Sequence, residues 1–451
     1  METDRTYILS DMRVKEAIYK MSLPVVFGMM VQVLYNLVDT WFIGMIGDAN
    51  QLAAANIASP VFIILMALAN IVGTGAASYI SRCLGMKNKD EANKTLSTGL
   101  LLCVIIGAVI SLIGLIFLKP FVILLGASSE VFPFARDYSI IMIACSIIVI
   151  SNFAIGQLMR AEGAAMQSIV GMMIGTVVNI ILDPIFIFAL NMGIQGAAIA
   201  TILGNISALT YYFYFYKSGK SILKFSFKNL KAEKTVYKEI FKIGIPATLS
   251  QILMSIALII CNNLASDYGT NALAGIGVST KLIYIGTFIF MGFGAGTQPL
   301  VGYSYGSKNF SRVKEVIREG IKITETIGII LTILFYFIAP LLVSLFTPIN
   351  DIVYWGTRVL RIQILLFLVV GPQMIANTSI QAFGKGREAL FISVARQGLL
   401  FIPLLFILNH YAGFTGLLLA QPIADFLTSI IALIILIKII KKETLIFDGK
   451  N

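Results

Sequence analysis

The sequence predicts an all-α integral membrane protein of twelve transmembrane helices, built as two tandem six-helix bundles. Three observations predict this class. The 451 residues are 58% hydrophobic and 13% charged, whereas soluble domains carry about 25% charged residues. Apolar stretches of 20 or more residues recur along the chain, and each can cross a hydrocarbon core of about 30 Å. The second half of the chain also repeats landmarks of the first.

Each predicted span is bounded by polar or charged residues and tolerates internal proline and glycine, because neighbouring groups in a membrane bundle satisfy the freed backbone. In the first half we expect spans at residues 17–46, 53–82, 95–117, 131–159, 166–190 and 194–216. In the second half we expect them at residues 240–266, 272–300, 313–339, 352–382, 389–410 and 414–438. Residues 1–20 are too polar for a cleavable signal peptide, so we expect the first helix to be retained.

An internal repeat relates the two halves. Gly73, Gly75, Gly85, Lys87 and Asn88 recur 221 residues later as Gly294, Gly296, Gly306, Lys308 and Asn309. Six spans return each half to its starting side, so we expect a pseudo-two-fold axis along the membrane normal. This divides the chain into an N-lobe (1–216), a cytoplasmic linker (217–239) and a C-lobe (240–451), which usually enclose a central cavity.

The distribution of Lys and Arg predicts the orientation. All but five of the 34 lie at the N-terminus, at the C-terminus or in connections on that same side. The exceptions are Lys119, Arg136, Arg358, Arg361 and Lys281. Positive residues collect in the cytoplasm, so we expect both termini there, in a multi-pass plasma-membrane protein. The basic excess therefore reflects topology, and we expect no nucleic-acid partner.

Few acidic residues lie inside the predicted spans. An ionised carboxylate there costs at least about 2.5 kcal/mol and usually has a function. Asp39 and Asp183 both lie seven residues from the outer ends of their spans, about 10 Å deep at 1.5 Å per residue. Asn179 shares a helix face with Asp183, and Thr201 lies at the same depth. Together they supply oxygen ligands for a cation such as Na⁺, or share a proton.

A structural role is the alternative for the two carboxylates. Pro184 removes a backbone donor from its own helix, so Asp39 and Asp183 could instead cap broken helices or bond to neighbouring backbone. We favour the functional interpretation because intramembrane acids usually mark ion or proton pathways.

At these residues the chain resembles the multidrug and toxic compound extrusion (MATE) family, in its bacterial and archaeal branch with N-lobe coupling. The resemblance covers about residues 15–440 and is strongest in three segments: Tyr35-Asn36-Leu37-Val38-Asp39-Thr40, Asn179-Ile180-Ile181-Leu182-Asp183-Pro184 and Gly196-Ala197-Ala198-Ile199-Ala200-Thr201. It implies that Asp39, Asn179, Asp183 and Thr201 form the cation or proton site, with Tyr35 and Tyr138 completing its network. Another branch carries acids on helices 7 and 10, but this chain has Gln251 on helix 7 and no acid within 352–382.

The substrate path is less defined. Polar residues near mid-membrane could line a cavity: Gln32, Asn70, Gln251 and Asn377. Asp425 could bind a cationic substrate or pair with Arg361 or Lys281, while Arg396 lies close enough to the cytoplasmic end to snorkel. The 30 Phe and 17 Met residues suit flat lipophilic cations, although lipid-facing Phe is ordinary in any membrane protein.

The leading hypothesis is therefore secondary antiport, in which a monomer exports organic, cationic compounds in exchange for Na⁺ or H⁺ without a cofactor. A flippase for lipid-linked sugars of the same superfamily is the alternative. An enzyme is disfavoured because the single His and four scattered Cys residues leave no catalytic or metal-ligand motif. Nor is there a nucleotide-binding loop, and the six-helix repeat fits alternating access better than a channel.

Overall fold

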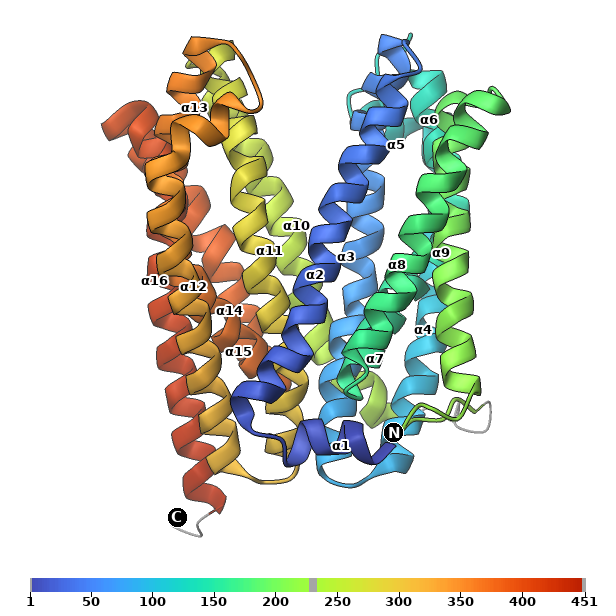
Figure 1. Cartoon of the computed structure of the whole chain (residues 1–451), viewed down its shortest axis with the longest axis vertical. Coiled ribbons are helices and arrows are strands. Elements are labelled where there is room, and N and C mark those ends of the chain that lie inside the picture. The colour runs from blue at the N-terminus through green and yellow to red at the C-terminus, as the bar shows by residue number, and fades with distance from the viewer. Residues whose placement is uncertain (1, 227–232, 448–451) are drawn as a thin grey trace. The chain divides into compact units, whose positions relative to one another are not determined.

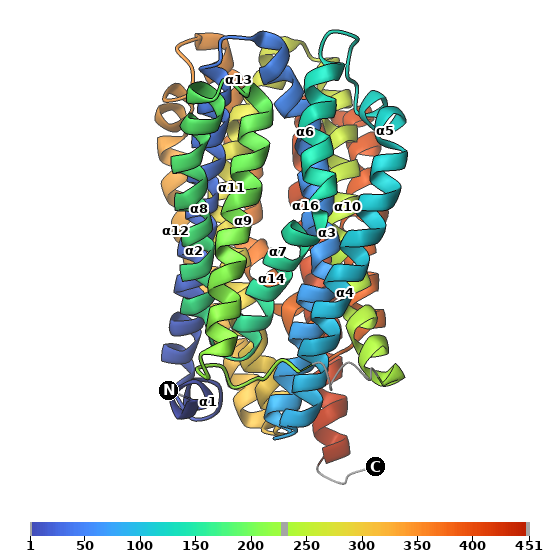
Figure 2. The same ribbon diagram turned by 90° about the vertical axis from the view of Figure 1, so that its right-hand side faces the viewer.

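The structure is a computed structural model that describes residues 2–226 and 233–447. Within these ranges the secondary structure is helical, without strands. The ribbon is drawn in Figure 1 and from a second side in Figure 2. The predicted all-α membrane class is confirmed.

The helices of the first half follow the predicted spans closely, and two short helices were not predicted, α1 and α5. The elements are α1 (Glu2–Ser10), α2 (Val14–Gly44), α3 (Ala49–Gly85), α4 (Lys89–Ile116), α5 (Leu118–Leu124), α6 (Phe132–Ala144), α7 (Ser146–Ala161), α8 (Ala165–Pro184), η1 (Ile185–Ala189) and α9 (Gly193–Lys217). Asp48 and Asn88 cap the starts of α3 and α4 by accepting bonds from Asn50 N and Glu91 N, as short polar side chains do at helix N-termini.

The second half has the same order of long helices. Its elements are α10 (Lys234–Ser266), α11 (Thr270–Gly306), α12 (Phe310–Ser344), α13 (Asn350–Gln363), η3 (Ile364–Leu366), α14 (Phe367–Ala382), α15 (Gly386–Val394), η4 (Ala395–Phe401) and α16 (Ile402–Phe447). Asn309 caps α12 through Arg312 N, and it is the repeat mate of Asn88. The repeat therefore extends to the local capping chemistry.

Ten helical stretches of the described chain are long and apolar enough to cross a membrane. The pair α6 and α7 bends by 58° at Cys145 and together meets the same test. The stretch from Gly386 to Leu445 contains two helices, because Gly413 leaves the helical conformation with φ 55°. Counting the bent pair as one span and this stretch as two gives the predicted twelve.

Packing divides the chain into two compact units. Unit 1 comprises Met1–Ile8 and Phe27–Thr248, and unit 2 comprises Leu9–Val26 and Leu249–Asn451. The first part of α2 therefore packs in unit 2, and the first part of α10 packs in unit 1. The two changes of unit lie 222 residues apart, shortly after Pro24 and Pro246, so the two halves exchange corresponding segments.

Close helix crossings hold the exchanged segments. In unit 1, a Cβ on Gly75 would lie 2.2 Å from the Ile240 carbonyl oxygen. In unit 2, a Cβ on Gly296, the repeat mate of Gly75, would lie 2.6 Å from the backbone Cα of Ser22. Only glycine permits such an approach of two backbones. Glycine at these corresponding positions thus explains how each exchanged segment packs against its neighbour.

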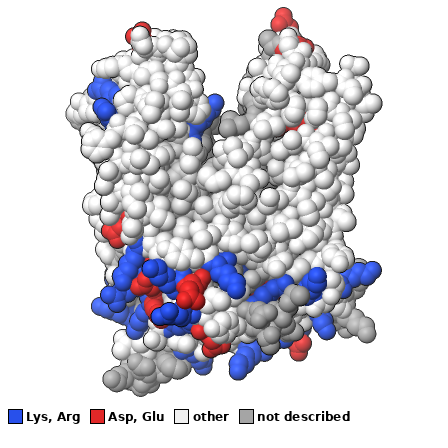
Figure 3. All heavy atoms as spheres, in the orientation of Figure 1, with Lys and Arg blue, Asp and Glu red and all other residues white. Residues whose placement is uncertain are grey.

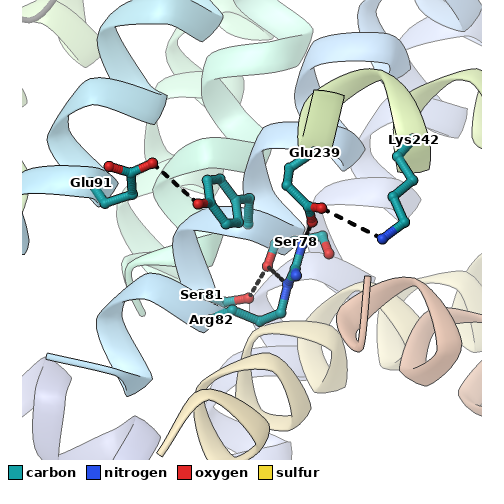
Figure 4. A network of polar contacts seen from close by, with 7 residues as sticks. Ser78, Ser81, Arg82, Glu91, Glu239 and Lys242 are labelled. Atoms are coloured by element: carbon teal, nitrogen blue, oxygen red, sulfur yellow. Dashed lines mark hydrogen bonds and ion pairs between the residues drawn. The ribbon is translucent and has the colours of Figure 1, made fainter. Parts of the chain in front are cut away.

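A charged network supports the crossing in unit 1 (Figure 4). Arg82 Nη2 of α3 lies 2.7 Å from Glu239 Oε2 of α10, and Lys242 Nζ lies 3.5 Å from Glu239 Oε1. Arg82 Nε also donates to the Ser78 carbonyl oxygen at 3.3 Å. The pair is largely shielded, with side-chain exposures of 12% and 16%. It ties the beginning of the second half of the chain to unit 1.

Charged side chains are unevenly distributed over each unit. Figure 3 shows Lys and Arg gathered at the end of each unit that carries a chain terminus. The sides of both units are almost free of charge in this view. An uncharged belt with a basic end is the pattern of a protein that spans a bilayer.

Candidate functional site

A polar cluster lies in unit 1 where α2, α8 and α9 pack together. Asp183 and Asn179 of α8 are 0% and 2% exposed, and Thr201 of α9 is 6% exposed. α8 and α9 run side by side (Figure 2), and α2 contributes Tyr35 and Asp39. The three elements come from separate parts of the first half, and their polar residues meet in an otherwise apolar bundle.

The cluster is joined by long hydrogen bonds. Asn179 Nδ2 donates to Asp183 Oδ1 at 3.3 Å and to Thr201 Oγ1 at 3.4 Å. Tyr35 Oη and Thr201 Oγ1 lie 3.3 Å apart. All three distances exceed the usual ranges of about 2.7–3.2 Å for N–H···O bonds and about 2.5–3.0 Å for O–H···O bonds. The hydroxyl of Thr201 thus links Tyr35 to Asn179 and Asp183 through long hydrogen bonds.

The two carboxyl groups interact directly with each other. Tyr138 of α6 also interacts electrostatically with both. The structure therefore brings together five of the six residues predicted for the coupling site, which are Tyr35, Asp39, Asn179, Asp183 and Thr201. Tyr138 has an electrostatic interaction with the two acids but no hydrogen bond to the cluster among the described contacts.

Three oxygens of this cluster are buried without a hydrogen-bond donor: Asp39 Oδ1, Asn179 Oδ1 and Asp183 Oδ2. A buried acceptor without a partner costs about 1–3 kcal/mol, and more when charged. A bound proton or a small cation would satisfy such oxygens. The described chain has no group of three or more His, Cys, Asp or Glu side chains that could hold a metal ion. The oxygens of this cluster come from two acids, an amide and a hydroxyl.

Local sequence explains the shape of the site. Pro184 follows Asp183 directly, and after it the helix widens into the π-helical turn η1. Proline removes one backbone donor and disfavours a regular α-helix around it. π-helical turns are frequently found at functional sites. On α9, Gly204 lets the chain approach Gly175 of α8, where an added Cβ would lie 2.6 Å from the Gly175 carbonyl oxygen.

The residues predicted to line a substrate cavity lie in both units. Asn70 is part of a second polar cluster in unit 1, where Gln157 Nε2 donates to Asn70 Oδ1 at 2.8 Å and Thr74 Oγ1 donates to Gln157 Oε1 at 3.0 Å. Gln32 and Gln251 are half-buried, and Asn377 Oδ1 is buried without a partner.

Asp425 has a different partner from those expected. Arg396 Nε donates to Asp425 Oδ1 at 2.7 Å, and Gln421 Nε2 donates to Asp425 Oδ2 at 2.9 Å. The expectation that Asp425 pairs with Arg361 or Lys281 was wrong, as was the expectation that Arg396 snorkels. Asp425 is 1% exposed, so the buried carboxylate holds the guanidinium within unit 2.

Sequence reasoning missed several polar residues. Gln157 joins Asn70, and Asn152 Nδ2 donates to Asn205 Oδ1 at 2.6 Å. Neutral amides in apolar helices carry no charge penalty, so they gave a weaker signal than the acids. A signal did exist for Asn205, because it is the repeat mate of Asp425.

Comparisons with known proteins find relatives that match nearly the whole chain. The model of the MatE family matches residues 24–185 and 246–407. The chain is 33% identical to the multidrug export protein MepA of Staphylococcus aureus over 435 residues, 96% of each chain, and 31% identical to MepA of Staphylococcus haemolyticus with the same coverage. The fold is similar to that of a multidrug resistance MATE family transporter in an outward-facing conformation, with TM-score 0.91, 26% identity and coverage of 97% and 98%. It is also similar to a MOP superfamily transporter from Pyrococcus furiosus, with TM-score 0.92, 26% identity and 98% coverage of both chains.

Proposed function

The chain belongs to the MatE family of multidrug transporters, and we propose that it exports small organic compounds in exchange for a cation bound between Asp39 and Asp183 of unit 1. The observation that carries the proposal is the buried cluster with three oxygens that lack a donor. It is a transporter and not an enzyme, as the family implies.

The coupling ion is Na⁺ or H⁺. Carboxylate, amide and hydroxyl oxygens are hard ligands for a bare cation. The same two carboxyl groups also form a pair that titrates as a unit, so that one proton is shared between them. Binding of either ion neutralises negative charge on Asp39 and Asp183 in a low-dielectric site. This change in local charge favours a different packing of α2 against α8.

Coupling through unit 1 alone is supported by the composition of unit 2. The repeat mate of Asp39 is Cys261, and the residue before Pro403, which corresponds to Asp183, is Ile402. Asp425 is already neutralised by Arg396 at 2.7 Å. Neither repeat mate of the two site acids is therefore a carboxylate, and the charge of Asp425 is compensated within unit 2.

We propose that both termini lie in the cytoplasm and that the protein resides in the plasma membrane as a monomer. The gathering of Lys and Arg at one end of each unit supports this orientation. As functional halves we keep an N-lobe of residues 1–216 and a C-lobe of residues 240–451, joined by residues 217–239.

The substrates are small organic molecules, and we propose that they are cationic and lipophilic. Gln32, Asn70, Gln251 and Asn377 remain our candidates for polar contacts along their path. The cluster of Asn70 with Gln157 and Thr74 supports this role for Asn70, because a mutually bonded amide set presents fixed dipoles.

Ethidium efflux from loaded vesicles tests the proposal. Native protein, Asp39→Asn and Asp183→Asn are compared under separately imposed Na⁺ and H⁺ gradients, with Asp267→Asn as the control, because Asp267 is exposed at the end of α10. We expect one gradient to drive efflux in native protein and in the control, and neither gradient to drive it in the two site variants. Normal efflux by Asp39→Asn and Asp183→Asn at equal expression would overturn the site.

A further inference from the structure

The coupling site is covered by an apolar layer. Ile43 follows Asp39 by four residues on α2, and Ile187 follows Asp183 by four residues. Ala197 precedes Thr201 by four residues on α9. Residues four apart on a helix lie above one another, and Ile43, Ile187 and Ala197 form one buried cluster with exposures of 2%, 3% and 0%. Each of the three elements thus places an apolar residue one turn outward from its site residue.

A cavity lies on the outer side of this layer, where Ile46 and Ile187 form part of its wall. Its volume is about 480 Å³. The lining also includes four polar side chains: Gln51, Asp137, Asn191 and Gln195. By the proposed orientation this cavity opens to the outside of the cell, because it lies between the α2–α3 and η1–α9 connections.

The cavity carries a fixed negative charge. Gln195 Nε2 donates to Asp137 Oδ2 at 2.7 Å, so a neutral amide binds this carboxylate. Gln51 Oε1 accepts from Ile194 N at 2.9 Å, and Gln51 Nε2 donates to Asp48 Oδ2 at 3.3 Å. Asp137 is therefore a carboxylate of the cavity lining that is held by a neutral donor, and Asp48 is bonded to the lining residue Gln51. Such a concave acidic surface raises the local concentration of cations.

We propose that this cavity, lined by Asp137, is the entry vestibule for the coupling cation, and that Ile43, Ile187 and Ala197 form a hydrophobic gate between vestibule and site. This proposal rests on the proposed function. An apolar constriction blocks a cation because the ion would have to shed its hydration water without replacement ligands. The gate must yield when the ion enters and must stay closed when the site opens to the cytoplasm.

The backbone beside the gate is suited to a local shift. Ile187 lies in the π-helical turn η1, after Pro184, where regular α-helical hydrogen bonding is already interrupted. Gly196 packs directly on this turn, because a Cβ there would lie 2.7 Å from the Phe186 carbonyl carbon. A small movement of η1 is therefore passed to the start of α9, which carries Ala197 and Thr201.

The gate is tested by the flux of ions without substrate. Native protein, Ile187→Ala and Ile43→Ala are reconstituted into proteoliposomes, and Na⁺ or H⁺ uptake is followed with an entrapped indicator dye. Ile181→Ala on α8, six residues before Ile187, is the control, because Ile181 is 57% exposed. We expect either gate variant to raise the leak several-fold, because the site then stays open outward while it is open inward. The control should match native protein.

Adding Asp39→Asn to the Ile187→Ala variant identifies the route, because a leak through the coupling site requires the carboxylate and should disappear. A leak that persists in the double variant would overturn the gate. The gate would also be overturned if Ile43→Ala and Ile187→Ala, both folded and monodisperse, show no added leak. Neither outcome would contradict the proposed function, because neither tests whether efflux depends on Asp39 and Asp183. Normal ethidium efflux by Asp39→Asn alone would instead overturn the proposed site.

The vestibule is tested by ion dependence. We expect Asp137→Asn to raise the ion concentration for half-maximal exchange several-fold without changing the maximal rate, and this effect should shrink at high ionic strength because salt screens exposed charge. Glu130→Gln is the matched control, since Glu130 is exposed in the preceding connection and is not part of the cavity lining. An equal effect of both variants, or no effect of Asp137→Asn, would overturn the vestibule.

Discussion

Glu162 lies in the connection between α7 and α8, outside the membrane-spanning segments, and its side chain is completely buried. Its Oε2 accepts from Ser221 Oγ at 2.6 Å, from Ile222 N at 2.9 Å and from Leu223 N at 3.2 Å. Arg5 of α1 donates to the Lys220 carbonyl oxygen at 2.7 Å. One carboxyl group thus holds the connection after α9 against unit 1.

Burial raises the pKa of Glu162 to about 7, although its hydrogen bonds oppose this shift. A carboxyl group with a raised pKa in the folded chain contributes stability below its unfolded pKa, and this contribution is lost as pH rises through the folded value. We therefore expect the unfolding temperature of native protein to fall more than that of Glu162→Gln between about pH 5 and pH 8. Fluorescence of Trp41 and Trp355 in detergent measures it, and parallel curves for the two proteins would contradict the prediction.

The pair of Arg396 and Asp425 predicts an asymmetry between two single variants. Arg396→Gln leaves a carboxylate that is 1% exposed with Gln421 as its remaining partner, whereas Asp425→Asn leaves a guanidinium that is 18% exposed. Loss of one partner of a buried pair costs about 3–5 kcal/mol, so Arg396→Gln should destabilise more than Asp425→Asn.

The double variant Arg396→Gln with Asp425→Asn should recover part of the stability, because no uncompensated charge remains. It should also retain ion-driven efflux, since the coupling site that we propose lies at Asp39 and Asp183. Thermal unfolding and ethidium efflux of the four proteins measure both effects. A double variant that is folded yet loses its response to the ion gradient would place Asp425 in coupling.

At the level of single residues, charge made the sequence informative. Asp39 and Asp183 were recognisable because a carboxylate in an apolar span is costly, and depth along each helix then predicted that Thr201 lies beside them. Glu162 was hidden because acids in connections are normally solvated. The sequence also did not predict which basic residue pairs with Asp425. Arg361, Lys281 and Arg396 all lie in the second half of the chain, and the packing of the helices brings Arg396 to the carboxylate.

At the level of elements, the close crossing of α3 and α10 predicts the effect of a single methyl group. Gly75→Ala should place its Cβ 2.2 Å from the Ile240 carbonyl oxygen, so the helices must separate. Overpacking of this kind costs about 1–3 kcal/mol. Gly277→Ala on α11 is the control, because a Cβ there meets nothing within 4 Å, and it should stabilise by up to about 1 kcal/mol.

Thermal unfolding of the two glycine variants measures this contrast. A stability of Gly75→Ala equal to or above that of native protein would mean that the backbones at this crossing are not in contact. The same comparison in unit 2, with Gly296→Ala against Ser22, should give a loss of similar size, because the two crossings are repeat mates.

Element positions followed from hydropathy, and most helix ends lie within a few residues of the predicted spans. The 58° bend at Cys145 did not follow, since no proline or glycine marks it. The π-helical turn after Pro184 was likewise not predicted, although the proline was noted. Hydropathy reports the solvent around a helix and not its partner, so the exchange of the first parts of α2 and α10 between units was not predicted either.

At the level of the whole molecule, the two halves of the repeat share packing and capping residues but differ in their buried charged residues. Gly75 and Asn88 keep their roles in Gly296 and Asn309, which permit a close crossing and cap a helix. Asp39 has Cys261 as its mate, and Asn205 has Asp425. These positions that maintain packing are therefore shared, while those that carry charge differ, which is consistent with our proposal that the coupling ion binds in the N-lobe.

The orientation of the whole chain is the last prediction. Ser128 lies exposed in the connection before α6, and Ser218 lies exposed after α9, in the basic part of the chain. In a background without the four native cysteines, Ser128→Cys should react with a membrane-impermeant maleimide on intact cells. Ser218→Cys should react only after permeabilisation, because positively charged connections stay in the cytoplasm. The reverse pattern would invert the topology and would turn the proposed vestibule toward the cytoplasm, so that Asp137 could no longer receive an external ion.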